Sequence, residues 1–216
     1  MFLAGLLSPP QTFVLAVVCL EFKNPMFNSI PDGERADREL MSLLKENGVP
    51  EKNFVLVEGK RATTARIDFE FREALGRARA EDTLLVYYAG HGFEHPAGFQ
   101  LATYNTYVGA PGWKMSRAFA LINSRFKGRS IALVADCCAS GLLQGFASKS
   151  RKGVAIFAAA LGASEVPEGW GFTKKLTSLL RESKGVLGQA KFNSEFKGHT
   201  IHWPDGVNEI RLWSSK

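Results

Sequence analysis

The sequence predicts an α/β protein: a three-layer α/β/α sandwich around a mostly parallel sheet of six strands. Short β-prone apolar runs alternate along the chain with stripes of helical periodicity, and turn residues separate them. Several of the runs are apolar throughout, which is typical of parallel strands covered on both faces. The 216 residues, 45% of them hydrophobic, supply one buried core, so we expect a single domain over residues 1–216.

The first half of the chain carries three of the expected strands. Residues 12–22 form a β-prone run, residues 54–57 a second, and residues 83–89 a third. A helical stripe over 31–47 lies between the first two strands, and Asn-Gly and Pro end it. A second helix begins after a pair of threonines and spans 63–82. This order predicts a strand–helix–strand–helix–strand unit.

The second half continues the alternation. A loop with hairpin strands is expected up to Gly112, and the Ser/Lys-rich stretch 144–153 is expected to be an exposed loop. The remaining expected elements are a helix over 118–126, strands over 130–136 and 154–160, a helix over 170–183, and a last strand over 207–213.

The N-terminal twenty residues are apolar enough to raise the question of a signal peptide or membrane anchor. They lack a basic leading segment, and Pro9-Pro10 interrupts the run, so a buried first strand is the favoured interpretation. Three cysteines, two of them adjacent, do not form the spaced, even set of a disulfide-stapled secreted domain. We therefore expect a reducing, cytoplasmic compartment and no membrane partner.

The formal net charge of +6 permits contact with an acidic surface, but basic and acidic residues are interleaved along most of the chain. The sequence has no zinc-finger spacing, no phosphate-binding glycine loop and no aromatic RNA-binding signature. Nucleic acid is therefore not an expected partner, and a basic nucleic-acid-binding domain stays a minor alternative.

Chemistry-bearing residues follow two of the expected strands. The third strand runs into Gly-His-Gly at His91, and the strand over 130–136 runs into a small-residue turn at Cys138. The carboxyl ends of parallel strands meet at one edge of a sheet. A thiol needs a base near neutral pH, and imidazole is its natural partner. The sequence thus predicts Cys138 as nucleophile and His91 as base.

The order of these two segments resembles that of the caspase-like cysteine peptidases, in which the histidine precedes the cysteine by about 50 residues. Asp136-Cys137-Cys138 followed by Ser140-Gly141 is similar to the metacaspase signature Asp-x-Cys-His-Ser-Gly, with Ala139 where metacaspases usually have His. The resemblance covers nearly the whole chain and extends to further short segments: Asn24-Pro25, Gly33-x-x-x-Asp37, Ala62-Thr63 and Phe172-Thr173.

The resemblance implies a caspase-like fold and hydrolysis of peptide bonds in protein or peptide substrates through a thioacyl-enzyme. The backbone N–H groups of Gly92 and Cys138 would form the oxyanion hole. The chain would divide into a large-subunit-like part (1–143), a loop (144–153) and a small-subunit-like part (154–216). Metacaspases often require calcium, but the sequence has no acidic loop dense enough to assign ligands, so calcium activation and the choice between monomer and homodimer stay open.

Cleavage after Arg or Lys is the expected specificity. Asp136 lies two residues before the nucleophile, and strand alternation puts both side chains on one face. The resemblance adds Glu34 and Asp37 as pocket residues, and Ala89 completes the substrate-binding set. Acidic residues in a first helical turn also simply favour the helix dipole, and Asp136 could instead orient a neighbouring group.

The basic residues of the 144–153 loop are candidate sites of regulatory cleavage. Lys149, Arg151 and Lys152 lie between the nucleophile strand and the next core strand, where exposure favours nicking. The alternative is that they only keep a surface loop soluble.

The other cysteines and histidines have structural interpretations. Cys19 and Cys137 are expected in the core, and three histidines are expected on the surface: His95, His199 and His202. A metal site of Cys137, Cys138, His91 and His95 is disfavoured because adjacent cysteines rarely reach one tetrahedral ion, so no metal ligands are assigned. A non-catalytic caspase-like interaction module is the leading alternative function.

Overall fold

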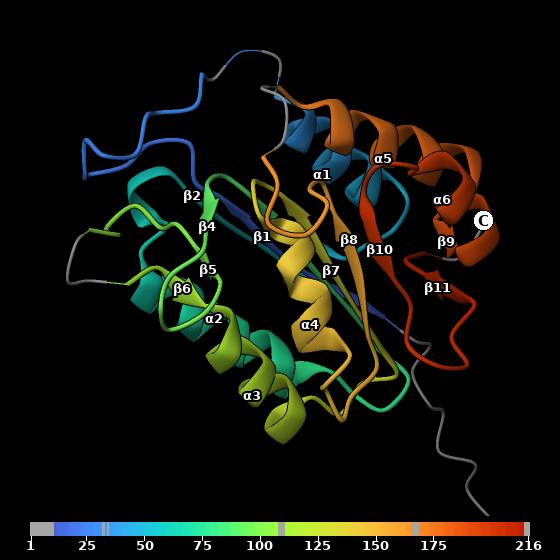
Figure 1. Ribbon diagram of the computed structural model, residues 1–216. Coiled ribbons are helices and arrows are strands. Elements are labelled where there is room, and N and C mark those ends of the chain that lie inside the picture. Colours follow the sequence, from blue (N-terminus) through green and yellow to red (C-terminus); the bar gives the residue numbers. More distant parts are fainter. Residues whose placement is uncertain (1–10, 32, 34, 108–110, 166–168, 214–216) are drawn as a thin grey trace, which may run out of the picture.

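In a computed structural model, residues 11–31, 33, 35–107, 111–165 and 169–213 are described. Their central feature is a six-stranded sheet with the strand order β10-β8-β7-β3-β1-β2 (Figure 1). All neighbouring strands are parallel except β10, which pairs antiparallel with β8. The six strands are β1 (Thr12–Val18), β2 (Phe54–Glu58), β3 (Thr83–Ala89), β7 (Ser130–Asp136), β8 (Val154–Ala158) and β10 (Thr200–His202).

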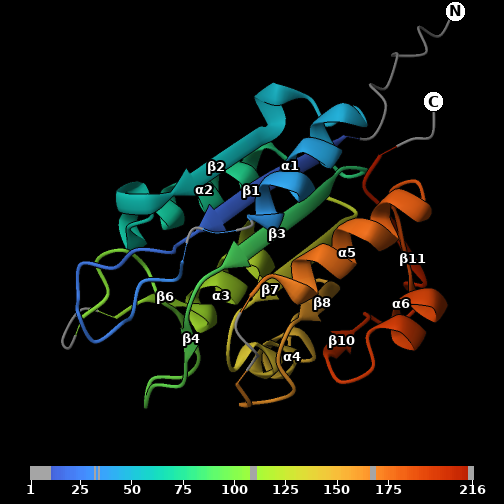
Figure 2. The ribbon, with the colours of Figure 1, turned by 90° about the horizontal axis from the view of Figure 1, so that it is seen from above.

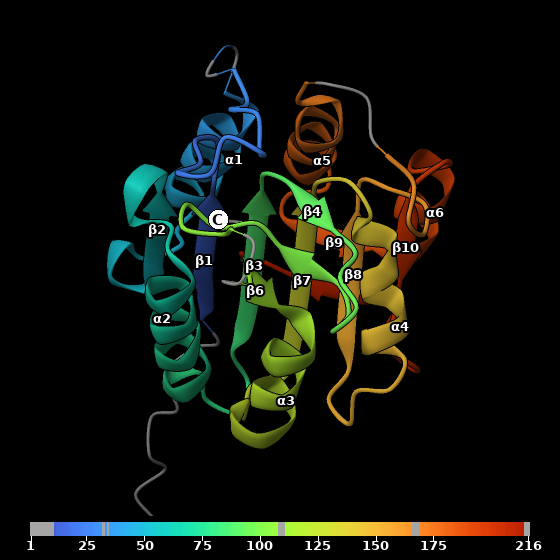
Figure 3. The same cartoon turned by 60° about the vertical axis from the view of Figure 1, so that its left-hand side comes forward.

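Helices cover both faces of this sheet (Figures 1 and 3). One face carries α2 (Thr64–Arg77), α3 (Met115–Arg125) and the short α4 (Leu143–Ala147). The other carries α1 (Ala36–Glu46), α5 (Gly171–Glu182) and α6 (Gln189–Glu195), with α1 and α5 side by side (Figure 2). In the described part of the chain, three short 3-10 helices complete the helical elements: Glu51–Asn53, Gly59–Arg61 and Ser140–Leu142.

The apolar runs of the strands explain this layering. Every residue of β1 and of β3 is buried. Side chains alternate between the faces, so Leu15 packs with the α2 and α3 layer and Ala16 with the α1 and α5 layer. Burial of two apolar layers is the main favourable term that holds such a sheet together. The expected α/β class and the expected six-stranded, mostly parallel sheet are confirmed.

Local signals place several helices where they were expected. Helix α2 begins after Thr63, whose hydroxyl accepts a hydrogen bond from the Arg66 backbone N–H at 3.3 Å. Helix α1 ends at Glu46, and the Asn47 side chain donates to the Leu43 carbonyl at 2.8 Å. The expected helices over 31–47, 63–82, 118–126 and 170–183 are present with shifted ends.

Among the described residues, two small antiparallel sheets lie outside the central one. The first consists of β4 (Gly92–Phe93), β5 (Gln100–Leu101) and β6 (Trp113–Lys114), in the segment expected to contain hairpin strands. The second pairs β9 (Val186–Gly188) with β11 (Glu209–Arg211). The β4 strand starts directly after His91, so the first small sheet helps to fix the histidine loop.

Two expectations about the second half of the chain are wrong. The sixth strand of the central sheet is β10, in a tail expected to have no pattern, whereas residues 207–213 contribute β11 to the two-stranded sheet. A three-residue edge strand gives no usable periodicity. The expected loop 144–153 begins inside helix α4, because Leu143 and Ala147, one helical turn apart, are both buried in the core.

Candidate active site

Strand register brings the predicted nucleophile and base to one edge of the sheet. In the parallel pairing of β3 with β7, Ala89 lies opposite Asp136, and the Gly90 backbone N–H donates to the Asp136 carbonyl at 3.4 Å. His91 and Cys138 each follow this register pair by two residues, and both are half-buried. The carboxyl edge therefore presents an imidazole and a thiol from adjacent strands.

The His91 ring is held by the loop that follows β1. Its Nε2 lies 2.8 Å from the backbone carbonyl oxygen of Asn28. A carbonyl only accepts hydrogen bonds, so Nε2 carries the proton, and Nδ1 keeps the lone pair that a base needs. Phe22 and Phe27 pack on the ring with centroid distances of 5.1 and 5.9 Å. Sequence reasoning missed Asn28, because a backbone contact leaves no mark in residue type.

The backbone on both sides of His91 is also fixed. The buried Tyr88 hydroxyl lies 2.9 Å from the His91 carbonyl oxygen and 2.7 Å from that of Ala102. A Cβ on Gly90 would lie 2.5 Å from this hydroxyl and 2.7 Å from the Cys19 carbonyl oxygen, so no side chain fits there. The histidine loop is thus built on a glycine and a buried tyrosine.

Gly92 and the loop around Cys137 and Cys138 are in close contact. A Cβ on Gly92 would fall well inside 3.0 Å of the Cys138 carbonyl oxygen and 2.9 Å from Cys137 Sγ. The two backbone segments expected to supply the oxyanion hole therefore lie against each other. Only glycine permits this approach at position 92.

The two adjacent cysteines have opposite environments. Cys137 is 2% exposed, and burial raises the pKa of its thiol well above the usual value. Cys138 is half-buried. After it the chain turns through Ala139, which has a φ of 55° and donates from its N–H to the Ser164 carbonyl at 2.8 Å. Cys137 is in the core as expected, and the thiol of Cys138 is the more accessible of the two.

Asp136, the last residue of β7, connects this strand to helix α5. Its Oδ2 accepts hydrogen bonds from the Thr173 hydroxyl at 2.6 Å and from the Thr173 backbone N–H at 3.3 Å. The Tyr87 hydroxyl lies 2.9 Å from the same Thr173 oxygen. Burial raises the pKa of Asp136, and the bonds from Thr173 oppose that rise. The carboxyl group orients Thr173 and lies two residues before the candidate nucleophile.

Asp37 is buried and already paired. The Arg35 guanidinium donates from Nε and Nη2 to its two carboxylate oxygens, both at 2.6 Å, and Nη2 also reaches Glu58 at 3.1 Å. The Arg35 and Asp37 side chains are only 8% and 2% exposed. Ala89 is buried at the end of β3, and Glu34 lies outside the described residues. Sequence reasoning did not anticipate Arg35 in this position.

The candidate cleavage loop is short and anchored. Lys149 and Arg151 are exposed and Lys152 is half-buried. The Asn123 side-chain oxygen accepts from the Ser150 hydroxyl at 2.8 Å and from the Arg151 and Lys152 backbone N–H groups at 2.8 and 3.2 Å. Helix α3 thus holds residues 150–152 in place.

The remaining cysteine and histidines are distributed as follows. Cys19 is fully buried, and burial raises its pKa to about 12. His95 is exposed as expected, whereas His199 and His202 are half-buried. All three cysteines are free. Among the described residues, no three His, Cys, Asp or Glu side chains are grouped so that they could hold a metal ion. The same part of the chain includes no helix long and apolar enough to cross a membrane.

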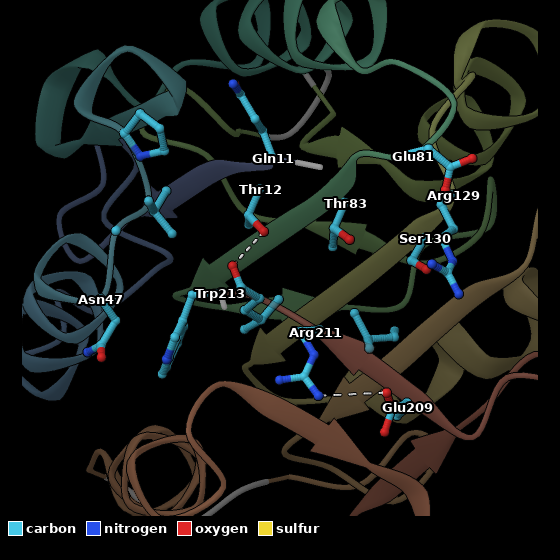
Figure 4. Close-up of a pocket in the computed structure, with 15 residues that line it drawn as sticks. Gln11, Thr12, Asn47, Glu81, Thr83, Arg129, Ser130, Glu209, Arg211 and Trp213 are labelled. Carbon is cyan, nitrogen blue, oxygen red and sulfur yellow. Dashed lines mark hydrogen bonds and ion pairs between the residues drawn. The ribbon is translucent and has the colours of Figure 1, made fainter. Parts of the chain in front are cut away.

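A cavity of about 520 Å³ lies at the opposite edge of the sheet (Figure 4). Thr12, Thr83 and Ser130, the first residues of β1, β3 and β7, line it. Its wall includes Arg211 and Glu209, which form a loose ion pair at 4.0 Å. The lining contains no cysteine or histidine, so this cavity is separate from the thiol and imidazole at the carboxyl edge.

Comparisons with known proteins give a fold and no activity. No family model matches the chain, and no curated protein matches it. Among solved structures, the chain is similar to protein GSU0716 of Geobacter sulfurreducens, a Northeast Structural Genomics target, with a TM-score of 0.60 and 14% sequence identity. The match covers 96% of this chain and 95% of that one. At this identity the likeness extends to the whole α/β architecture and to nothing finer.

Proposed function

We propose that this protein is a cysteine endopeptidase of the caspase-like fold, similar to the metacaspases. The observation that carries the proposal is the register of β3 and β7. It sets Gly-His-Gly and Asp-Cys-Cys side by side at the carboxyl edge, with the His91 ring bonded through Nε2 to a carbonyl. Catalysis would use Cys138 as nucleophile and His91 as base.

The proposed reaction has two halves. His91 Nδ1 takes the thiol proton of Cys138, the sulfur attacks the peptide carbonyl carbon, and the C–N bond breaks as the same imidazole protonates the leaving amine. Water then hydrolyses the thioacyl-enzyme, with His91 again as base. The Asn28 carbonyl would hold the ring in this orientation, because it accepts the hydrogen bond from Nε2.

The backbone N–H groups of Gly92 and Cys138 would stabilise the oxyanion of each tetrahedral intermediate. Support comes from the contact between these two segments, which leaves no room for a side chain at Gly92. Preorganised donors of this kind typically contribute about 100- to 1,000-fold to kcat each.

We further propose cleavage after Arg or Lys. Asp136 lies two residues before Cys138, and Asp37 supplies a second carboxylate that already binds a guanidinium in the structure. A site with these two carboxylates and Ala89 around it would favour a cationic side chain and repel an acidic one. Its substrates would be proteins or peptides.

Regulation is proposed from the same resemblance, and location is proposed from the cysteines. Cleavage after Lys149, Arg151 or Lys152 would separate a large-subunit-like part from a small-subunit-like part. All three thiols are free, which supports the proposal of a reducing, cytoplasmic compartment.

A positional-scanning library of fluorogenic peptides, read with and without calcium, tests the proposal. We expect turnover by the wild type with Arg or Lys before the scissile bond, and none by Cys138→Ala. Turnover that persists in Cys138→Ala, or its absence from the wild type under both conditions, would contradict protease activity. Faster cleavage after Asp than after Arg would refute the acidic pocket alone.

A further inference from the structure

We propose that Arg35 occupies the subsite for a basic substrate side chain and is displaced when such a side chain binds. The inference rests on the proposed function and adds a specificity element to it. Arg35 would act as an internal competitor for Asp37, with Glu58 as its alternative partner.

The first argument is the contact itself. Two parallel N–H···O bonds of 2.6 Å join the Arg35 guanidinium to the Asp37 carboxylate. This fork-to-fork geometry is the one that a substrate arginine would adopt on the same carboxylate. With the Arg35 and Asp37 side chains 8% and 2% exposed, a ligand reaches Asp37 only if Arg35 moves.

The second argument is the location of the pair at the carboxyl edge of the sheet, where Arg35 contacts Glu58 at the end of β2. Arg35 immediately precedes α1, and Asp37 lies in its first turn. Helix α1 packs on α5 (Figure 2). Thr173, in the first turn of α5, donates a hydrogen bond to Asp136. The Tyr87 hydroxyl, which bonds to Thr173, lies close enough to Asp136, Asp37 and Arg35 for their charges to affect its pKa. Burial raises its pKa, Asp136 and Asp37 raise it further, and Arg35 opposes the rise.

The third argument is that Arg35 has somewhere to go. Its Nη2 already contacts Glu58 at 3.1 Å, at the end of β2, and the Glu58 side chain is 48% exposed. A guanidinium that leaves Asp37 therefore keeps one carboxylate and gains water. Meanwhile the incoming cation replaces its charge against Asp37, so no buried carboxylate is left unpaired.

This arrangement has a consequence for affinity. A ligand that binds only when Arg35 is displaced has its apparent affinity reduced by the fraction of molecules in the displaced state. A neutral side chain, which cannot replace Arg35 on Asp37, gains nothing from displacement. A purely structural Arg35–Asp37 pair would leave the affinity for cationic and neutral ligands unchanged when Arg35 is altered.

The test uses two acetylated peptides that differ only in a terminal arginine or citrulline. Calorimetry measures their binding to Cys138→Ala, in which cleavage is blocked. Adding Arg35→Gln removes the cation that competes for Asp37. It should therefore tighten binding of the arginine peptide by about tenfold and leave binding of the citrulline peptide unchanged. Arg38→Gln removes an exposed cation from the same helix and is the matched control for net charge.

Glu58→Gln is expected to have the opposite effect on binding of the arginine peptide. Without this carboxylate the displaced Arg35 has a poorer partner, so the arginine peptide should bind about two- to fivefold more weakly, as expected for a partly exposed ion pair. Because Arg35→Gln leaves Asp37 with a neutral partner and could unfold α1, Arg35→Lys is a second variant. Lysine keeps the positive charge but cannot form the two parallel hydrogen bonds that arginine makes with a carboxylate. We therefore expect intermediate affinity for the arginine peptide and a wild-type unfolding temperature.

The outcomes separate the two levels of the proposal. Equal affinity for the arginine peptide in Cys138→Ala with and without Arg35→Lys or Glu58→Gln, where the wild type hydrolyses arginine substrates, would overturn the role of Arg35 and leave the protease standing. No binding of either peptide by any variant, together with no hydrolysis by the wild type, would overturn both.

Discussion

Replacing Gly92 with alanine tests the contact between the histidine loop and the nucleophile loop. The added methyl group would fall well inside 3.0 Å of the Cys138 carbonyl oxygen, 2.9 Å from Cys137 Sγ and 3.1 Å from Phe99 Cζ. Two of these atoms belong to the nucleophile segment, and one is backbone. The methyl group therefore cannot be accommodated by a side-chain rotation alone, and the two loops must separate.

The expected size of the effect follows from this geometry. Relief of the closest contact requires a shift of about 1 Å, and misplacement by that distance can cost about 100-fold in rate. Because Gly92 also supplies one proposed oxyanion donor, the loss in kcat should lie between about 100- and 1,000-fold. Overpacking of this kind should lower the free energy of unfolding by about 1 to 3 kcal/mol, so the protein is still expected to fold.

The assay is steady-state hydrolysis of an arginine-ending fluorogenic peptide, with thermal unfolding measured on the same samples. Gly145→Ala is the matched control, since a Cβ there meets nothing within 4 Å and lies in helix α4. It should keep wild-type kcat and gain up to about 1 kcal/mol of stability. Wild-type kcat/KM and unfolding temperature in Gly92→Ala would refute the close approach of the two loops.

Three further outcomes are expected. Cys137→Ala should keep most activity and cost about 1 kcal/mol of stability, because this thiol is buried; an inactive variant would show that the nucleophile is misassigned by one residue. The native Asp136 carboxyl, whose pKa is raised from 3.8, keeps its proton where the unfolded one has lost it. The free energy of unfolding of the wild type should therefore fall as pH rises from about 3.8 through the native pKa, and Asp136→Asn should lack this fall. If urea unfolding gives the two proteins the same dependence of this free energy on pH, the raised pKa of Asp136 is contradicted. Asn123→Ala should speed nicking by trypsin within 149–152 about fivefold, since three hydrogen bonds anchor that loop to Asn123, and an unchanged rate would show that the anchor does not protect it.

The central strands and their end residues were predictable from sequence. Apolar runs such as β3 and β7 predict buried strands, and neighbouring parallel strands bring their carboxyl ends together. His91 and Cys138 could therefore be placed at one edge from the order of residues alone. Gly92 was also identifiable, because glycine next to a candidate catalytic histidine points to close backbone approach.

Other parts of the site could not be predicted. The acceptor for the His91 ring is a carbonyl in an irregular loop, and every residue type carries a carbonyl. The Arg35–Asp37 pair depends on the entry angle of α1, which local sequence does not specify. Strand β10 was missed because three residues at a sheet edge carry no periodic signal. Each of these features depends on how the backbone is folded, and none of them leaves a pattern in the sequence.

The central claim is that Cys138 is a nucleophile activated by His91. Its most direct test is labelling by an arginyl peptide electrophile, followed by intact-mass measurement and peptide mapping. We expect one label per chain, on Cys138, with no label in Cys138→Ala and slow labelling in His91→Ala; Cys19 and Cys137 should stay unmodified because both are buried. A label on Cys137, or equal labelling rates in wild type and His91→Ala, would contradict the account.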